Sequence, residues 1–469
     1  MDYIRTATGG QLLQGDPSSK VESISVDSRT LKSGALFFAL PGDNFDGHAY
    51  VYQALQKGAA AACVSKPIQL TSHEADQGLI MVSDTLQALQ DLARTYRQGF
   101  DIPLVGVTGS VGKTTTKDLI ALCLQGRFNT LKSSGNHNND IGLPLSLLEL
   151  EARHQAAVLE MAMRDRGEIE RLARISRPTC AVITNVERVH LETLLTLENI
   201  ARAKCELLAE MNQDGFALIN GDCPELVKES QIYPITRYLF GHHSDCHFQI
   251  QKTRVQEEGI SIQARLIDRE EEFFFPIPAS RLASNVLAAV AIAYLLGVEP
   301  EISRNQLLNY RSERRRLNII RQHGGGIIID DTYNANPISM AAALECGRDL
   351  PSCGKWIAVL GDMFELGEDE RTGHMEVGRL AAISRVDHLV AVGVRAQFIA
   401  QGAREAGLPE QCIHYFSSKS QAISCLKDLL NADDKILFKA SRGMELETLI
   451  CDLDVWDKTV DREDQISIE

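Results

Sequence analysis

The chain has 469 residues, of which 44% are hydrophobic and 24% are charged, and its formal net charge is −15. This length predicts two or three globular domains. The negative charge excludes a broad surface for nucleic acid or anionic membrane, where positive charge supplies most of the affinity.

The first residues and the cysteines do not indicate secretion. The start, Met1 to Arg5, lacks a basic stretch followed by an apolar one, so we expect no secretory signal. The eleven cysteines include no C-x-x-C pair, which favours reduced thiols over a disulfide framework or a metal site. The longest apolar stretch, Val286 to Val298, is too short to span a bilayer and is predicted to be a core helix. We therefore expect a cytoplasmic protein without stable membrane insertion.

Residues 1–100 are predicted to form a small α/β domain. Its predicted elements are strands at Val21 to Val26, Ala35 to Leu40 and Ala59 to Val64, and a helix at Tyr50 to Lys57 that ends at Gly58.

Residues 101–312 alternate strands and helices in the manner of a doubly wound, mostly parallel sheet. Ala156 to Leu159 and Cys180 to Ile183 are predicted buried strands, and Leu194 to Met211 is a predicted helix. Charges around Glu257 and from Arg269 to Glu272 indicate exposed loops or hairpins.

Residues 313–469 are predicted to form a third, Rossmann-like α/β domain. Its predicted strands are Ile327 to Ile329, Trp356 to Leu360, Leu389 to Val392 and Ile436 to Phe438. Several of these strands run into Gly, Asp or Ser, and open α/β sheets place their ligand contacts at such strand ends.

The most informative stretch is the loop Thr108 to Thr115, between a predicted strand, Ile102 to Val107, and a helical pattern, Lys117 to Leu124. Strand, glycine loop, Gly-Lys-Thr and helix form the layout of a nucleotide-phosphate cradle, although the strict motif requires Gly where Val107 stands. Lys113 is expected to reach the β- and γ-phosphates, and the Thr114 hydroxyl to bind Mg²⁺. We expect the phosphates to contact Gly109, Ser110, Val111, Gly112, Lys113, Thr114 and Thr115.

Three single residues have both a binding and a structural interpretation. Glu160 ends a predicted strand, where a carboxylate holds Mg²⁺ or caps a helix. His190 follows a strand, and a lone histidine is commonly structural. Lys204 lies in mid-helix, and periodicity alone favours a solvated surface lysine.

Three segments are similarly open. Gly135 to Pro144 is rich in amides, which suit either ligand binding or a series of turns. Asp330 to Pro337 offers an acidic pair for ribose hydroxyls, or a helix cap. Arg314 to Arg316 is a basic cluster that clamps phosphate or is merely solvated.

Together these residues resemble the Mur ligases, ATP-dependent enzymes that form amide bonds, and their folylpolyglutamate synthetase relatives. The phosphate loop, Glu160, Asn185 with His190, and Lys204 carry the resemblance, which covers nearly the whole chain. The first region resembles the family's UDP-sugar-binding domain, through Asp27 to Arg29, Gly34, Pro41 to Gly42, and Phe45 to His48. Three segments are more selective: the asparagine-rich loop Gly135 to Pro144, the segment Asp330 to Pro337, and the segment Gly361 to Gly367. They resemble the corresponding segments of the family members that add D-alanyl-D-alanine to a UDP-N-acetylmuramoyl-tripeptide.

The resemblance implies a cytoplasmic step of peptidoglycan precursor synthesis that uses ATP and Mg²⁺. It implies Thr114, Glu160 and His190 as magnesium ligands, and Lys113, His190 and Lys204 as catalytic residues. Lys204 matches a position that is carbamylated in several relatives. Implied nucleotide contacts are Asn285, Arg316 and Asp331, and implied substrate contacts are Ser28, Arg29, Asn136, Asn138, Asn139, Asn334, Asn336, Ser441 and Arg442. We expect a monomer that binds these two substrates and no nucleic acid.

The chain departs from the family pattern at three further places. Relatives carry His-Asn, associated with adenine binding, where this chain has Arg281-Leu282, and Gly where it has Ala440. The Gly usual before Arg316 is also replaced, by Arg315. We expect an active enzyme with altered adenine contacts, because the phosphate and metal positions are kept.

Joining two amino acids requires an activated carboxylate. We hypothesise that the terminal carboxylate of the tripeptide attacks the γ-phosphorus of ATP, and that the amine of D-alanyl-D-alanine then attacks the acyl phosphate. One alternative is a folylpolyglutamate-synthetase-like glutamate ligase, which would not need the first region. The other is a non-catalytic nucleotide-binding scaffold, suggested by Arg281-Leu282.

Overall fold

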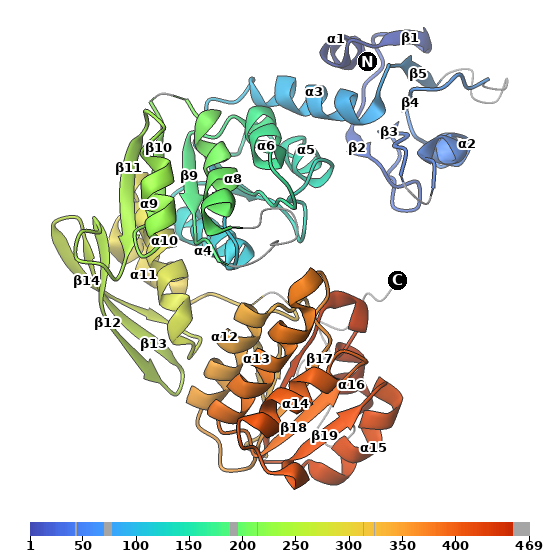
Figure 1. The fold of residues 1–469 in the computed structure, drawn as a ribbon. Coiled ribbons are helices and arrows are strands. Elements are labelled where there is room, and N and C mark those ends of the chain that lie inside the picture. Colours follow the sequence, from blue (N-terminus) through green and yellow to red (C-terminus); the bar gives the residue numbers. More distant parts are fainter. Residues whose placement is uncertain are drawn as a thin grey trace. The chain divides into compact units, whose positions relative to one another are not determined.

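The computed structural model describes residues 1–42, 45–69, 77–187, 196–212, 214–312, 314–322 and 324–453. The chain divides into two compact units. The first comprises Met1–Val186, Glu198–Leu239 and Ala288–Glu299, and the second comprises the described parts of Glu187–Leu197, Phe240–Leu287 and Pro300–Glu469. The described residues form three sheets, which follow one another along the chain from blue to red in Figure 1.

The N-terminal sheet has five strands in the order β1-β5-β4-β3-β2. Strands β2 to β5 run parallel, and β1 pairs antiparallel with β5. Successive residues of β3 face opposite sides, so Phe37 packs with α2 and Phe38 with α3 in two separate cores. The elements are α1 (Asp2–Thr8), β1 (Gln11–Gln14), β2 (Ser23–Ser25), β3 (Ala35–Phe38), α2 (Val51–Gln56), β4 (Ala61–Val64), β5 (Gly78–Met81) and α3 (Thr85–Arg97).

The second sheet has nine strands in the order β14-β13-β12-β11-β10-β9-β6-β8-β7. The pairs β7–β8, β8–β6, β6–β9 and β9–β10 are all parallel. Its strands are β6 (Leu104–Thr108), β7 (Thr130–Lys132), β8 (Ala156–Glu160), β9 (Cys180–Ile183), β10 (Phe216–Asn220), β11 (Thr236–Gly241), β12 (Phe248–Gln256), β13 (Gly259–Leu266) and β14 (Arg269–Phe275). Its helices are α4 (Lys113–Gln125), α5 (Gly142–Leu147), α6 (Glu168–Ser176), α8 (Leu197–Ala209), α9 (Pro224–Ser230), α10 (Ala283–Leu295) and α11 (Pro300–Leu307).

Burial explains why the central strands are continuous apolar runs. Every residue of β6, β8 and β9 is buried, as expected for parallel strands covered on both faces. The core helix expected at Val286 to Val298 is α10, in which Val286 to Ala293 are at most 1% exposed. None of the helices within the described segments has the length and apolarity needed to cross a membrane.

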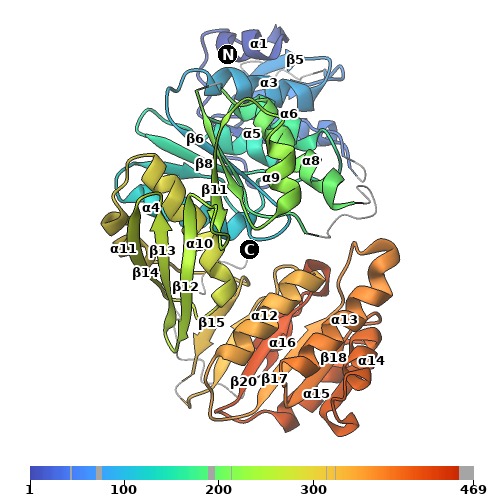
Figure 2. The ribbon, with the colours of Figure 1, turned by 60° about the vertical axis from the view of Figure 1, so that its left-hand side comes forward.

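Three antiparallel strands, β12 to β14, extend the second sheet and lie side by side in Figure 2. The charges at Glu257 and Glu258 lie in the β12–β13 turn, so the hairpin interpretation of this charged region is correct. On the edge strand β14, Phe273 and Phe275 are buried, and Glu271 on the same face is mostly buried, where it pairs with Arg269 (2.7 Å) and Arg304 (2.6 Å).

The third sheet has six strands in the order β15-β16-β20-β17-β18-β19. All pairs are parallel except β15–β16. Figure 1 shows α12, α13 and α14 on one side of this sheet and α15 and α16 on the other, which is the doubly wound arrangement. The elements are β15 (Asn318–Arg321), β16 (Ile327–Asp330), α12 (Pro337–Asp349), β17 (Trp356–Gly361), α13 (Glu370–Ile383), β18 (His388–Val392), α14 (Gln397–Glu405), β19 (Ile413–Phe416), α15 (Lys419–Leu429), β20 (Lys435–Lys439) and α16 (Glu447–Asp452).

Candidate active site

The predicted phosphate loop joins the buried strand β6 to helix α4, which begins at Lys113. Two of its residues require glycine. Gly109 has φ +151°, and a Cβ there would meet Thr184 Oγ1 at 1.9 Å. Gly112 has φ +82° and ends the loop in the left-handed region. The start of a helix carries the positive end of the helix dipole and N–H groups that lie beyond the intrahelical ladder, so the beginning of α4 is a favourable place for an anion.

The loop is held from the end of the neighbouring strand β9. Asn185 accepts the backbone N–H of Ser110 on its carbonyl oxygen (3.1 Å) and that of Val111 on Oδ1 (2.9 Å). The Thr184 hydroxyl donates to Val111 O (2.8 Å). Lys113 Nζ donates to Gly109 O (2.9 Å) and Ser110 O (3.2 Å), so its ammonium lies over the loop. Asn185, which the sequence paired with His190, thus braces the loop.

Glu160 lies next to this loop, because strand register pairs it with Val107 of β6. Its side chain is buried, and Asn138 Nδ2 donates to Glu160 Oε1 (2.8 Å). Glu160 Oε2 is buried and has no hydrogen-bond partner among the described residues. A buried carboxylate oxygen without a donor is unfavourable unless a cation or water meets it, and a hard cation such as Mg²⁺ prefers oxygen ligands. Glu160 therefore fits a magnesium site.

The asparagine-rich loop serves both as a turn and as part of this site. Asn138 contacts Glu160, and its carbonyl accepts the N–H of Ala162 (2.9 Å). Asn139 Oδ1 accepts the N–H of Gly142 (2.9 Å), the first residue of α5. Asn136 is exposed. Of the three predicted asparagines, the structure brings only Asn138 onto the carboxylate.

Lys204 is buried on α8, so the interpretation as a solvated surface lysine is wrong. Leu207 and Leu208, one turn further along the same face of α8, are buried as well. Burial, and then repulsion from Lys113, lower the pKa of Lys204 well below its usual value. The two lysines therefore lie close enough to interact electrostatically. His190, the remaining predicted ligand, lies outside the described residues.

In the N-terminal domain, Ser28 and Arg29 differ in exposure. Ser28 is buried and its hydroxyl donates to Gln53 Oε1 (2.9 Å). Arg29 is exposed, and its guanidinium donates to the carboxylate of Asp27 (Nη2–Oδ2 2.8 Å), which lowers the pKa of Asp27. Arg29 is thus a cation on the surface of this domain.

In the second unit, Asp331 follows β16 and is already engaged. Lys439 Nζ donates to Asp331 Oδ2 (2.5 Å), and the N–H of Leu317 donates to Oδ1 (3.0 Å). The guanidinium of Arg316 stacks over the Tyr333 ring, 3.9 Å from its centroid. Arg316 is therefore held by Tyr333, and Asp331 by Lys439 and the backbone of Leu317.

The turn after β20 is positioned by groups distant in sequence. The N–H of Phe364 donates to Ser441 Oγ (2.9 Å). Glu447 Oε1 accepts from both Arg442 (2.5 Å) and Arg315 (2.9 Å). Of the two asparagines before α12, Asn336 forms a capping box with Ser339, and Asn334 accepts the N–H of Ala335 (2.9 Å). The helix-cap interpretation of this segment is therefore correct for Asn336.

Sequence reasoning missed His374, which holds the segment Gly361 to Met363 after β17. Its Nε2 accepts the N–H of Met363 (3.0 Å), and its Nδ1–H donates to Glu370 O (2.6 Å). Burial lowers the pKa of His374, which favours this neutral tautomer. The only sequence signal is a histidine in a helix that follows a Gly-Asp strand end.

Arg281, which replaces a family residue associated with adenine, forms an ion pair with Glu345 of α12. Both belong to the second unit. Asn285, the implied nucleotide contact next to it, is half-buried at the start of α10.

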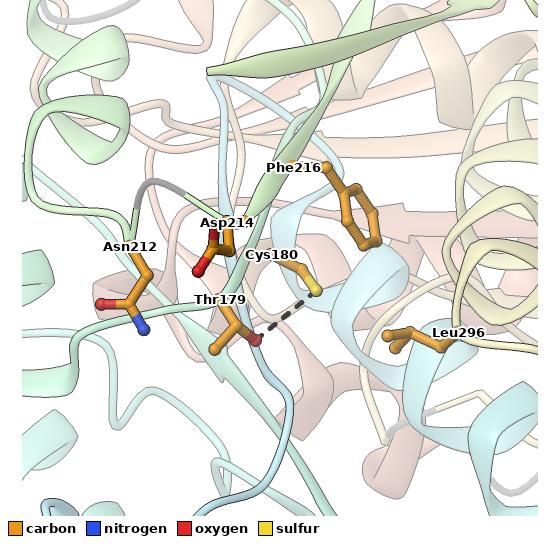
Figure 3. Close-up of a pocket in the computed structure, with 7 residues that line it drawn as sticks. Thr179, Cys180, Asn212, Asp214, Phe216 and Leu296 are labelled. Carbon is orange, nitrogen blue, oxygen red and sulfur yellow. Dashed lines mark hydrogen bonds between the residues drawn. The ribbon is translucent and has the colours of Figure 1, made fainter. Parts of the chain in front are cut away.

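A cavity of about 420 Å³ lies elsewhere in the first unit, at the amino-terminal ends of β9 and β10 (Figure 3). Thr179, Cys180, Asn212, Asp214, Phe216 and Leu296 line it, with Thr179 Oγ1 3.6 Å from Cys180 Sγ. Because β6 and β9 are parallel, this edge of the sheet is opposite the phosphate loop. Ligands of open α/β sheets bind at the carboxyl ends, so the cavity is not the predicted nucleotide site.

The parallel sheet, the glycine loop and the adjacent buried carboxylate define a phosphate-loop nucleotide-binding protein. Three family models match: "Mur ligase family, catalytic domain" at residues 20–97, "Mur ligase middle domain" at 107–293 and "Mur ligase, glutamate ligase domain" at 315–442. The chain is 38% identical over 433 residues, 92% of its length and 93% of the relative's, to a UDP-N-acetylmuramoyl-tripeptide–D-alanyl-D-alanine ligase of Bacillus subtilis. The chain belongs to the Mur ligase family.

Solved structures agree with this assignment. A crystal structure of MurF from Acinetobacter baumannii has a TM-score of 0.86 at 30% identity, covering 96% of this chain and 97% of that one. MurF ligase from Thermotoga maritima in complex with ADP has a TM-score of 0.79 at 28% identity, covering 92% and 96%. Folylpolyglutamate synthase from Mycobacterium tuberculosis, at 14% identity and a TM-score of 0.61, shares the fold alone. The family and the three-domain α/β fold predicted from the sequence are confirmed.

Proposed function

We propose that this protein is the ATP-dependent ligase that adds D-alanyl-D-alanine to UDP-N-acetylmuramoyl-tripeptide, a step of peptidoglycan precursor synthesis. The relatives named for this reaction align with nine-tenths of the chain, at up to 38% identity among those compared. The observation that carries the chemistry is the buried, half-satisfied carboxylate of Glu160, set in register beside the strand that enters the phosphate loop. A folate ligase is not favoured, because its likeness is limited to the fold.

We assign the phosphate-binding role to Gly109 through Thr115. Lys113, whose ammonium lies over the loop, would follow the γ-phosphoryl group as the tripeptide carboxylate attacks it. Glu160, Thr114 and His190 would hold Mg²⁺, which when bound neutralises charge on the phosphate oxygens. The amine of D-alanyl-D-alanine then attacks the acyl phosphate and phosphate departs.

Lys204 is proposed to act in its carbamylated form. The neutral amine is the nucleophilic state, and the low pKa of Lys204 makes that state available. Addition of CO₂ to this amine would form an N–C bond, release a proton and leave an anion beside Lys113. A protonated Lys204 is repelled by the ammonium of Lys113, whereas the carbamate anion would be attracted to it.

Other predicted contacts are assigned by domain. The UDP part of the substrate would bind Ser28 and Arg29, and Asn136, Asn138 and Asn139 would line the peptide. In the second unit, Asn285, Arg316 and Asp331 would contact the nucleotide, and Asn334, Asn336, Ser441 and Arg442 the substrates. Stacking on Tyr333 and the Lys439–Asp331 pair support this by holding Arg316 and Asp331 in fixed geometry.

We propose that the protein is a monomer whose three domains comprise residues 1–100, 101–312 and 313–469. We also propose that the enzyme works in the cytoplasm, where ATP is available. All eleven cysteines are free, which is the state expected of thiols in a reducing compartment.

The test measures phosphate release from ATP with UDP-N-acetylmuramoyl-tripeptide and D-alanyl-D-alanine, omitting each substrate in turn. We expect release only when both are present. Nucleotide binding by calorimetry without release would favour a scaffold, and release driven by a folate and glutamate would favour the other ligase.

A further inference from the structure

Lys117, one turn into α4, has no assigned role, yet its side chain is fully buried. Its Nζ donates to the carbonyl oxygen of Ser133 (2.9 Å) and lies 3.3 Å from Asp118 Oδ1. A buried ammonium is unfavourable unless it is paired and hydrogen-bonded, and removal of its partners is strongly destabilising. The contacts of Lys117 with Ser133 and Asp118 are therefore needed to keep its ammonium buried.

The contact with Ser133 connects Lys117 to the proposed metal ligand. Ser133 follows β7 and is buried, with its N–H bonded to Val158 O (3.0 Å) on β8. The N–H of Glu160 donates to Ser133 Oγ (3.1 Å). A continuous path thus runs from the Lys117 ammonium, through both polar ends of Ser133, to the backbone of Glu160.

Helix α4 also begins at the phosphate loop, only four residues before Lys117. The lysine therefore joins the helix that carries Lys113 and Thr114 to the strand end that carries Glu160. The pairing of Glu160 with Val107 fixes the position of Glu160 along the sheet. The hydrogen bond from Lys117 to Ser133 holds α4 against the segment that follows β7.

We propose that Lys117 is a positioning residue, which holds the Glu160 carboxylate at the separation from the phosphate loop that a divalent cation requires. This rests on the proposed function only in taking Glu160 as a metal ligand. Groups that orient a metal ligand typically change metal affinity about 10–100-fold when removed. Lys117 acts on the metal rather than on the nucleotide itself, because its partner is Ser133.

Lys132 provides a matched control. Its ammonium lies 2.6 Å from the same Asp118 oxygen, but its side chain is half-exposed, whereas that of Lys117 is fully buried. Replacement of Lys132 by Met therefore removes a lysine from Asp118 and leaves the path to Glu160 intact. Any effect that arises only from Asp118 appears in both variants.

The experiment measures Mn²⁺ binding to the full-length protein saturated with ADP, by electron paramagnetic resonance, for the wild type, Lys117→Met and Lys132→Met. We expect the Mn²⁺ dissociation constant to rise about tenfold or more in Lys117→Met and less than twofold in the control. The affinity for ADP with EDTA present should be unchanged. Equal Mn²⁺ affinity in the two variants, or a loss of metal-free ADP binding in Lys117→Met, overturns the proposal.

A second variant covers the case in which Lys117→Met does not fold. Ser133→Ala removes the hydroxyl that accepts from Glu160 but keeps the carbonyl that Lys117 needs, so we expect Mn²⁺ affinity to fall again. Unchanged affinity in Ser133→Ala contradicts the path. Phosphate release by the wild type separates the two ideas: release with no Lys117 effect refutes only this inference, and a Lys117 effect without release refutes only the proposed reaction.

Discussion

Replacement of Glu160 by Gln should raise the stability of the ligand-free protein while it strongly lowers its activity. Glu160 Oε2 is buried without a partner, whereas Oε1 accepts from Asn138, an interaction that Gln retains. A buried unsatisfied polar group costs about 1–3 kcal/mol, and more when charged. We expect the amide to recover about 1 kcal/mol of unfolding free energy, which shifts the midpoint by about 2–4 °C in a unit of 150–250 residues.

Bound nucleotide and metal should reverse the order of stability of the wild type and the Glu160→Gln variant. At about 100 times its dissociation constant a ligand adds about 2.7 kcal/mol to stability, and almost none if its affinity falls 100-fold. The wild type should therefore become the more stable protein once Mg²⁺ and a non-hydrolysable ATP analogue are present. Turnover of the variant should fall about 10²–10³-fold, the scale seen when one transition-state contact is removed.

Calorimetric melting with EDTA, and again with Mg²⁺ and the analogue, tests both statements on the same samples. Exposed Glu149, changed to Gln, controls for the loss of one negative charge and should alter neither order nor turnover. A Glu160→Gln variant that melts below the wild type under both conditions, or that turns over normally, would refute the reasoning.

Three other substitutions give separate tests. Lys113→Ala should lower kcat at least 100-fold, about 3 kcal/mol, in the phosphate-release assay, and near-normal turnover would contradict its role. Lys204 has a lowered folded pKa, so below about pH 10.4 the unfolded chain binds the extra proton and wild-type stability rises with pH toward that value. Lys204→Met should flatten this slope in denaturant titrations between about pH 9 and 10, and an unchanged slope would count against it. His374 likewise has a lowered folded pKa, so stability should fall as pH drops below about 6.5. His374→Gln keeps a donor and an acceptor and should weaken that dependence in thermal scans, whereas an identical pH profile would exclude His374 as its source.

Local pattern predicted the strands and the phosphate loop because their signals are contiguous. The buried runs that became β6, β8 and β9 and the Gly-Lys-Thr turn are read within a dozen residues. The short strands β1, β5 and β7 were not predicted, because a run of three or four residues has too little periodicity to stand out.

The site was harder to predict, since its key contacts join distant residues. Asn138 and Glu160 are 22 positions apart, and only the pairing of β8 with β6 brings the carboxylate to the loop. The prediction failed for Lys204 because its charge favoured the solvated face of α8, whereas Leu207 and Leu208, one turn further along the same face, are buried. His374 gave no motif, since its task is to accept a backbone N–H.

The acidic half of β14 has a consequence for the behaviour of the protein at high concentration. As the last strand of the nine-stranded sheet, β14 presents backbone groups that a strand from another molecule could extend. Its exposed glutamates, Glu270 and Glu272, set like charges against any second copy that docks there in register. The fold thereby discourages edge-to-edge self-association along the exposed half of β14, while Phe273 and Phe275 in its other half are buried within the molecule.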